Sequence, residues 1–161
     1  MKPRLSASSH LALAVAMAIA VHLASIYLAP DLIMRRVIKT VASESAQPYW
    51  PPPIDHTQRR IVMPSPDLLY AVCAYDLSQG PLQVELAASY PRYWSIALYN
   101  SRSDNFMTVS SGEVKENPMP LIIDESVSTR RGLLLMRVLT GGKPEWLAEA
   151  DAFRRQLSCV Q

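Results

Sequence analysis

Residues 132–139 read GLLLMRVL, and this stretch decides the fold of the chain. Leu133 to Met136 are all apolar, so neither face of the segment suits contact with water. A short apolar run bounded by turn residues is typical of a strand that is buried on both faces. Gly141 and Gly142 follow and end the segment. We therefore predict that residues 132–139 form a central strand of a β-sheet.

Other short apolar segments flank this strand, with turn residues between them. Leu82, Val84 and Leu86 alternate with polar residues, as expected for a strand with one buried face. The predicted strands are residues 59–63, 68–75, 82–87, 93–99, 106–110, 121–123 and 132–139. Their regular spacing predicts a mainly β fold, a small antiparallel β-sandwich or barrel-like domain.

The pattern changes to a helical period near the end of the chain. Apolar residues recur at this spacing within residues 144–157, at Trp146, Leu147, Ala150 and Phe153. Pro144 suits the first turn of a helix, and acidic residues precede basic ones, which matches the helix dipole. We expect an amphipathic helix over residues 144–157 that covers one face or end of the sheet.

The N-terminal part has a different texture. Residues 11–29, LALAVAMAIAVHLASIYLA, form a run of 19 residues without Asp, Glu, Lys or Arg. A helix of this length matches a bilayer core of about 30 Å. The run is long for a signal peptide, so we interpret it as a retained transmembrane anchor, with a cleaved signal peptide as the alternative. The helix is expected to continue past Pro30 and to end near Ser45.

Basic residues lie on both sides of this run. Arg35, Arg36 and Lys39 follow it and are expected at the membrane surface, near anionic headgroups; a solvated helix end is the alternative. The two sides carry similar numbers of positive charges, so the orientation depends on the short N-terminal tail and the long polar remainder. These favour a signal anchor with the C-terminal part outside the cytoplasm.

The sequence divides into three parts. Residues 1–45 contain the tail, the anchor and its extension, residues 46–58 are a stiff Pro-rich spacer, and residues 59–161 form the β domain. From Glu44 onward the chain has 11 Lys and Arg against 13 Asp and Glu, a net charge of −2. Such a balance argues against nucleic acid as a partner.

Few residues point to catalysis. His56 is the single histidine beyond the anchor region, and no HExxH, CxxC, EF-hand or G-x-S-x-G pattern occurs. We therefore assign no catalytic residue, metal ligand or cofactor. Cys73 lies in an apolar run and is interpreted as a small buried residue. A disulfide to Cys159 is the alternative if the domain lies in an oxidising compartment.

Four short motifs occur in a fixed order along the β domain. They are Asp67-Leu68-Leu69-Tyr70, residues 75–81 (YDLSQGP), Arg92-Tyr93-Trp94-Ser95 and Asn105-Phe106. Together they resemble the bacterial family called domain of unknown function 1254, over residues 63–114. The anchor and residues 129–133 also resemble short, membrane-anchored members. The resemblance implies a β-rich domain, often accompanied by a second β domain called domain of unknown function 1214, here a separate chain.

The chain departs from the family pattern near the first motif. Ser65 and Pro66 stand where the family favours Asn, Leu68 replaces Thr, and Ala71 replaces Ser. If those polar positions bind a ligand in relatives, this chain has lost part of the site. The residues that match the pattern are our candidates for ligand binding: Asp67, Tyr70, Asp76 and Tyr93.

Three functions are consistent with these features. The leading hypothesis is a single-pass protein of the bacterial inner membrane, whose anchor has the lipid bilayer as its partner and whose periplasmic β domain is a binding or assembly module. The alternative is a small envelope hydrolase acting on a glycan or lipid, which needs a cleft that joins Asp67 or Asp76 to a tyrosine. An obligate subunit of a membrane complex, with no ligand of its own, is the third.

Overall fold

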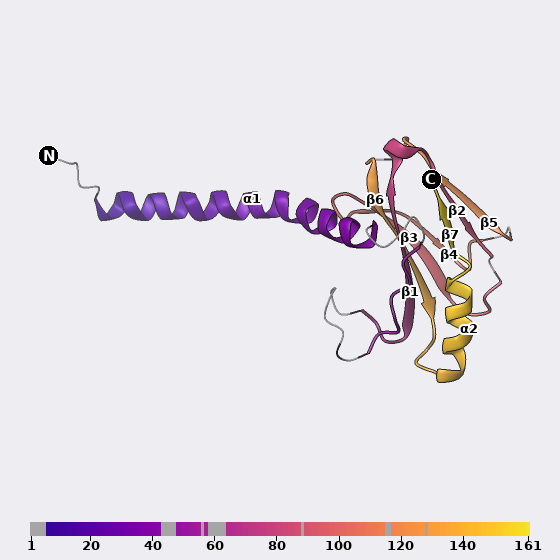
Figure 1. Cartoon of the computed structure of the whole chain (residues 1–161). Helices are drawn as coiled ribbons and strands as arrows, with labels where there is room; N and C mark the ends of the chain where they lie inside the picture. Colours follow the sequence, from indigo (N-terminus) through magenta and orange to yellow (C-terminus); the bar gives the residue numbers. More distant parts are fainter. Residues whose placement is uncertain are drawn as a thin grey trace.

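The structure, a computed structural model, describes residues 6–42, 48–55, 57, 64–87, 89–114, 117–127 and 129–161. A long N-terminal helix leads into a strand-rich domain that ends with a second helix and a short strand (Figure 1). The elements are α1 (Ala7–Ala42), β1 (Leu68–Asp76), a 3-10 turn (Leu77–Gln79), β2 (Leu82–Leu86), β3 (Trp94–Asn100), β4 (Asn105–Ser110), β5 (Met119–Ile123), β6 (Arg131–Leu139), α2 (Pro144–Arg154) and β7 (Ser158–Val160).

Two antiparallel sheets form the domain. One has the strand order β1-β6-β3-β4, and the other has the order β5-β2-β7. The GLLLMRVL stretch lies in β6, which pairs with β1 on one side and β3 on the other. The predicted central strand is therefore confirmed. Its apolar character on both faces follows from this position, because the other sheet covers one face and part of α1 covers the other.

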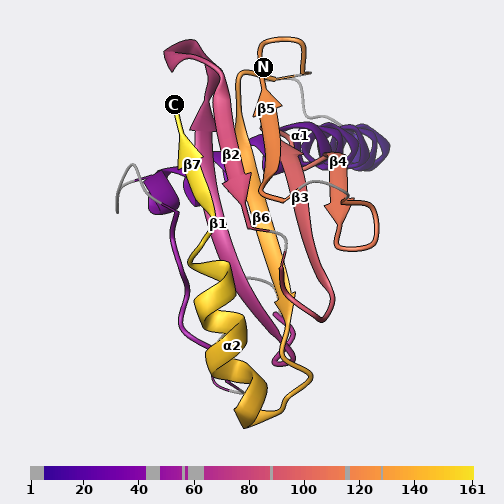
Figure 2. The same ribbon diagram turned by 90° about the vertical axis from the view of Figure 1, so that its right-hand side faces the viewer.

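Inward-facing side chains of both sheets form one core. Leu134 and Met136 of β6 are fully buried, and so are Val84 and Leu86 of β2. Figure 2 shows the three-stranded sheet in front of the four-stranded one, with α2 at one end of the domain. The predicted fold class, mainly β with a helix near each terminus, is confirmed.

Helix α1 consists of two segments with different surroundings. Its apolar run is exposed, and by length and composition α1 could span a membrane, although a signal sequence has the same features. Beyond Pro30 the helix continues, and Met34 and Val41 pack against Leu133 on the outer face of the four-stranded sheet. Helix α1 therefore projects from that face of the domain (Figure 1). The predicted helix end near Ser45 lies outside the described residues.

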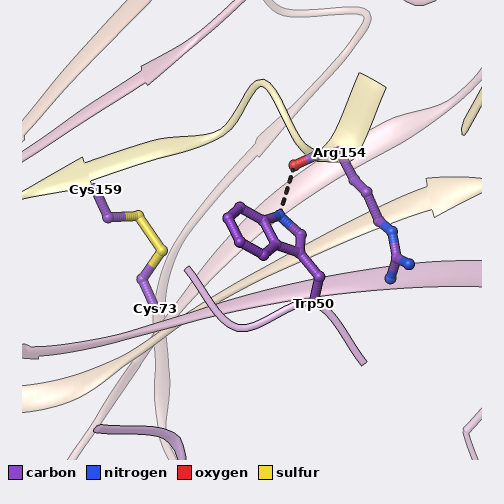
Figure 3. Close-up of a disulfide and its surroundings, with 4 residues drawn as sticks. All are labelled: Trp50, Cys73, Arg154 and Cys159. Atoms are coloured by element: carbon purple, nitrogen blue, oxygen red, sulfur yellow. Dashed lines mark hydrogen bonds between the residues drawn. A yellow bond between two sulfur atoms is a disulfide. The ribbon is translucent and has the colours of Figure 1, made fainter. Parts of the chain in front are cut away.

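The Pro-rich segment is attached to the domain where the structure describes it. Tyr49 pairs with Val72 of β1 through two backbone hydrogen bonds of 2.8 and 2.9 Å. The indole of Trp50 donates to the carbonyl of Arg154 at 3.2 Å (Figure 3). The free edge of β1 offers unpaired backbone groups, which explains why this segment lies along it. The predicted strand 59–63 falls outside the described residues.

The C-terminal end differs from the sequence prediction. Helix α2 ends at Arg154 rather than at residue 157, and the chain then forms the unpredicted strand β7. Cys159 of β7 forms a disulfide with Cys73 of β1, with 6.6 Å between the Cα atoms (Figure 3). Cys73 is buried, as expected, and the alternative of a bridge to Cys159 is the state that the structure has. The bridge joins the two sheets covalently.

Candidate functional site

The four predicted ligand-binding residues lie at opposite ends of β1. Asp67 immediately precedes the strand, whereas Asp76 is its last residue. An extended chain of this length separates the two aspartates by about 30 Å. Tyr93 lies at the Asp67 end, because its carbonyl accepts a hydrogen bond from Leu139, which pairs with Leu68. Tyr70 lies at this end too, so the structure brings three candidates to one end and places Asp76 at the other.

At the Asp67 end, polar groups of the candidates hold turns in place. The carbonyl of Asp67 accepts hydrogen bonds from the Thr140 amide at 2.8 Å and the Thr140 hydroxyl at 2.9 Å. The hydroxyl of Tyr70 accepts one from the Ser65 amide at 3.0 Å. The side chain of Tyr93 is 50% exposed. These contacts explain a structural role for Asp67 and Tyr70 and leave Tyr93 as a surface aromatic residue.

Aromatic and cationic groups fill the same end. The Arg92 guanidinium lies over the rings of Tyr90 and Trp146, 4.8 and 4.4 Å from their centroids. Hydrogen bonds to Tyr90 and to Glu149 raise the pKa of Arg92 further above its ordinary value. The Tyr90 ring in turn stacks on Phe153 of α2, at 4.9 Å between centroids. This end of the domain is therefore packed.

A cavity of about 1160 Å³ lies at the other end, between α1 and the domain. Its walls come from the C-terminal turns of α1, the end of β1, the turn before β6, and β7. Four cationic side chains line it, against two carboxylate side chains. The cations are Arg35, Lys39, Arg130 and Arg131, and the carboxylates are Asp31 and Asp76. Apolar groups, among them Ile38 and Val160, complete the lining.

Asp76 stabilises one wall of this cavity. Its carboxylate accepts hydrogen bonds from the Ser78 hydroxyl at 2.7 Å and amide at 3.1 Å, and it pairs with Arg131 at 2.7 Å. The hydrogen bond from the Ser78 hydroxyl, together with that from Arg131, lowers the pKa of Asp76. The side-chain amide of Gln161 accepts a hydrogen bond from the Asp76 backbone amide and donates one to the Asp76 carbonyl, at 3.0 Å each. Asp76 is thus an ionised residue whose partners belong to the protein itself.

The electrostatics of the cavity favour an anion over acid–base chemistry. Arg35, Lys39 and Arg130 have no carboxylate partner within the part of the chain that the structure describes. Guanidinium groups bind phosphates and carboxylates through paired hydrogen bonds. Burial raises the pKa of Tyr75 to about 12, so its hydroxyl stays protonated. Neither Asp76 nor Tyr75 is therefore suited to proton transfer at neutral pH.

This cavity brings together residues that the sequence predictions treated separately. Arg35 and Lys39 were predicted at the membrane surface, and Asp76 was a candidate, whereas Arg130, Arg131 and the β7 residues were missed. The Arg130-Arg131 pair next to the central strand was the available signal. For a metal ion, the described residues contain no group of three His, Cys, Asp or Glu side chains close enough to bind one.

Comparisons with known proteins identify the family. The crystal structure of the VPA0106 protein from Vibrio parahaemolyticus has a similar fold, with a TM-score of 0.59 over 86% of this chain and 15% sequence identity. This chain spans only 36% of that one. No curated protein matches the chain. The profile described as Protein of unknown function (DUF1254) matches residues 46–161. The chain, most of whose length is matched, therefore belongs to the DUF1254 family.

Proposed function

We propose that this chain is a single-pass protein of the bacterial inner membrane whose β domain, a β-sandwich, lies in the periplasm and serves as a binding or assembly module. The Cys73–Cys159 disulfide is the observation that carries the proposal. Disulfides persist in oxidising compartments such as the periplasm and are rare in the cytosol. This location requires the C-terminal part to lie outside the cytoplasm, as the N-in, C-out orientation has it.

The surroundings of α1 support a retained anchor. The apolar run up to Ala29 has no protein partner among the described residues, so only lipid would remove it from water. Met34 and Val41, which follow, are buried against the domain. The anchor thus holds the four-stranded sheet facing the bilayer, and Arg35, Arg36 and Lys39 lie where the helix leaves it.

An assembly role is supported by the outer face of the three-stranded sheet. Ile122 of β5 is 66% exposed and Val160 of β7 is 57% exposed, and both lie opposite Gln83 of β2. The matched Vibrio chain is much longer, and this chain corresponds to about a third of it. A separate chain that carries domain of unknown function 1214 is our proposed partner at this face.

The hydrolase alternative is less well supported. It needs a carboxylate and a tyrosine in one cleft. Asp76 and Tyr75 both line the cavity, but Asp76 is held ionised by its own partners and burial raises the pKa of Tyr75, whereas Asp67 lies in the packed end. The obligate-subunit alternative differs from the leading proposal in having no ligand. Binding of a ligand by the isolated chain separates these two.

Protease treatment of intact spheroplasts tests the location and orientation. We expect the protease to reach the β domain from outside, while alkaline carbonate leaves the chain in the membrane pellet. A domain that is degraded only after lysis, or a chain that carbonate extracts, contradicts the proposal.

A photoreactive residue at position 122 tests the partner, with position 147 on α2 as the matched exposed control. Crosslinks to the DUF1214 chain from position 122 alone support assembly, and equal crosslinking from both positions contradicts it.

A further inference from the structure

The cavity between α1 and the domain lies where a lipid headgroup would be. Asp31, the first charged residue after the apolar run, lines the cavity, and so does Lys39 two turns later. These two positions are about 12 Å apart along the helix axis. A headgroup layer is about 6 Å thick on each side of a bilayer. Asp31 is therefore level with the headgroups if α1 spans the membrane, and Arg35 and Lys39 follow one and two turns beyond it.

The charges of the cavity come from both sides of the junction. Arg35 and Lys39 project from α1, and Arg130 and Arg131 belong to the turn and strand that face it. Arg131 is paired with Asp76, which fixes its position in the wall. Arg130 and the two α1 cations form no ion pair within 4 Å among the described residues, although Asp31, one turn before Arg35, also lines the cavity. A group that carries negative charge would complete this arrangement.

The lining is also partly apolar. Ile38 and Val41 of α1 and Leu82 of β2 are among its walls. A free inorganic anion uses none of this surface, whereas the carbon atoms of a lipid headgroup would contact it. Charge and apolar surface together match a molecule with a phosphate at one end and hydrocarbon at the other.

We infer that this cavity binds the headgroup of an anionic phospholipid drawn from the leaflet in which α1 ends. The phosphate lies between the α1 cations and Arg130, and the acyl chains stay in the leaflet. The inference rests on the proposed anchoring of α1. It adds a specific ligand class and the domain's own arginines to that anchoring, so that the lipid links the helix to the sheet.

The test uses the full chain in detergent, titrated with phosphatidylglycerol and followed by native mass spectrometry. Phosphatidylcholine with the same acyl chains is the neutral comparison. The test variant is Arg35→Gln/Arg130→Gln. The control variant is Lys143→Gln/Arg155→Gln, which removes the same charge from exposed positions at the α2 end. Soluble glycerol phosphate distinguishes a lipid from a free phosphate as the source.

We expect phosphatidylglycerol to bind at least about tenfold more tightly than phosphatidylcholine, since only the former carries net charge. Each cation removed from the cavity should weaken that binding about fivefold, while the control variant changes it less than about twofold. Equal affinity for the two lipids, equal losses in both variants, or glycerol phosphate binding as tightly as the lipid overturns the inference. Because the assay is in detergent, it is independent of the carbonate and protease tests of the proposed function.

Discussion

The two ends of β1 have opposite construction. At the Asp67 end, Arg92 is stacked between Tyr90 and Trp146, and Phe153 of α2 completes the packing. At the Asp76 end, a cavity of about 1160 Å³ with a cationic lining lies between α1 and the domain. The same strand thus has one end that is filled by its own side chains and one that is open to another molecule.

The packed end supports the fold, and the end with the cavity is the candidate for ligand binding. Residues of the family motifs occur at both ends, so the motif pattern alone does not identify a site. Asp67 and Tyr70 bond to turns, whereas Asp76 positions Arg131 in the cavity wall. We therefore assign the candidate ligand site to the Asp76 end, and the packed end to support of the fold.

Loss of the disulfide should have the largest effect on stability, because it joins β1 to β7 covalently beside the cavity. Replacing both Cys73 and Cys159 by Ala removes a crosslink between positions 86 residues apart. The free energy of unfolding should fall by about 4 kcal/mol, because the unfolded chain is no longer constrained. Urea unfolding of the full chain in mild detergent, followed by tryptophan fluorescence, measures this. A double variant as stable as the wild type would mean that β7 is held equally well without the bridge.

Arg154 should give the next largest effect, at the packed end. Its guanidinium is 2% exposed and donates 2.7 Å hydrogen bonds to the carbonyls of Pro51 and Tyr70, besides pairing with Asp151. Arg154→Met leaves these acceptors unpaired and should cost about 3 kcal/mol. The matched control is Arg155→Met, which also loses a bond to Asp151 but from an exposed position, and should cost less than about 1 kcal/mol.

The same urea unfolding assay reads the Arg154 pair of variants. Equal destabilisation by the two would show that the ion pair to Asp151 matters more than the buried bonds to the Pro-rich segment. In that case the hydrogen bonds from Arg154 to the Pro-rich segment would contribute little to the stability of the domain.

Gly132 provides a smaller test at the open end. A Cβ at this position would lie well inside van der Waals contact of the Tyr99 carbonyl and the Tyr75 hydroxyl. Gly132→Ala should therefore cost about 2 kcal/mol through displacement of these groups. Gly112→Ala is the control, because nothing lies within 4 Å of its added methyl group. Thermal unfolding by circular dichroism compares the two; similar midpoints would contradict the tight packing behind the cavity.

The smallest expected effect concerns pH and the carboxylate of Asp76. The Ser78 hydroxyl and Arg131 lower its pKa in the folded state, so its ionised form stabilises the fold above the ordinary pKa of about 3.9. That contribution is lost as the pH falls through the lower folded value. It should be under about 1 kcal/mol, since the pair is partly exposed. Unfolding midpoints between pH 6 and pH 2 should fall less steeply for Asp76→Asn; an identical slope contradicts the assignment.

The sequence predicted the fold better than the site, for physical reasons. The strand β2 buries apolar side chains at every second position, and the central strand β6 contains a continuous apolar run; both patterns can be read from the local sequence. Strand β7 spans only Ser158–Val160, and its pairing depends on β2 and on the bridge from Cys159. A segment of three residues is too short to show a strand period in the sequence.

The candidate site depends on contacts between distant parts of the chain. Its residues run from Asp31 to Gln161, and no local motif places Arg35 opposite Arg130. Likewise Tyr49 lies in a Pro-rich segment that suggests a free spacer, yet it pairs with Val72 because β1 has an open edge. Local sequence determines the strands, whereas topology determines which strand ends meet.

The central claim is that α1 stays in the membrane while the β domain folds in an oxidising compartment. Intact-mass spectrometry of the chain, purified from membranes without reductant after alkylation of free thiols, tests both halves together. We predict a mass that includes residues 11–29 and is two hydrogens below that of the reduced chain, with no alkyl group added. A chain that lacks this run, or one that carries two alkylated cysteines, would contradict the account.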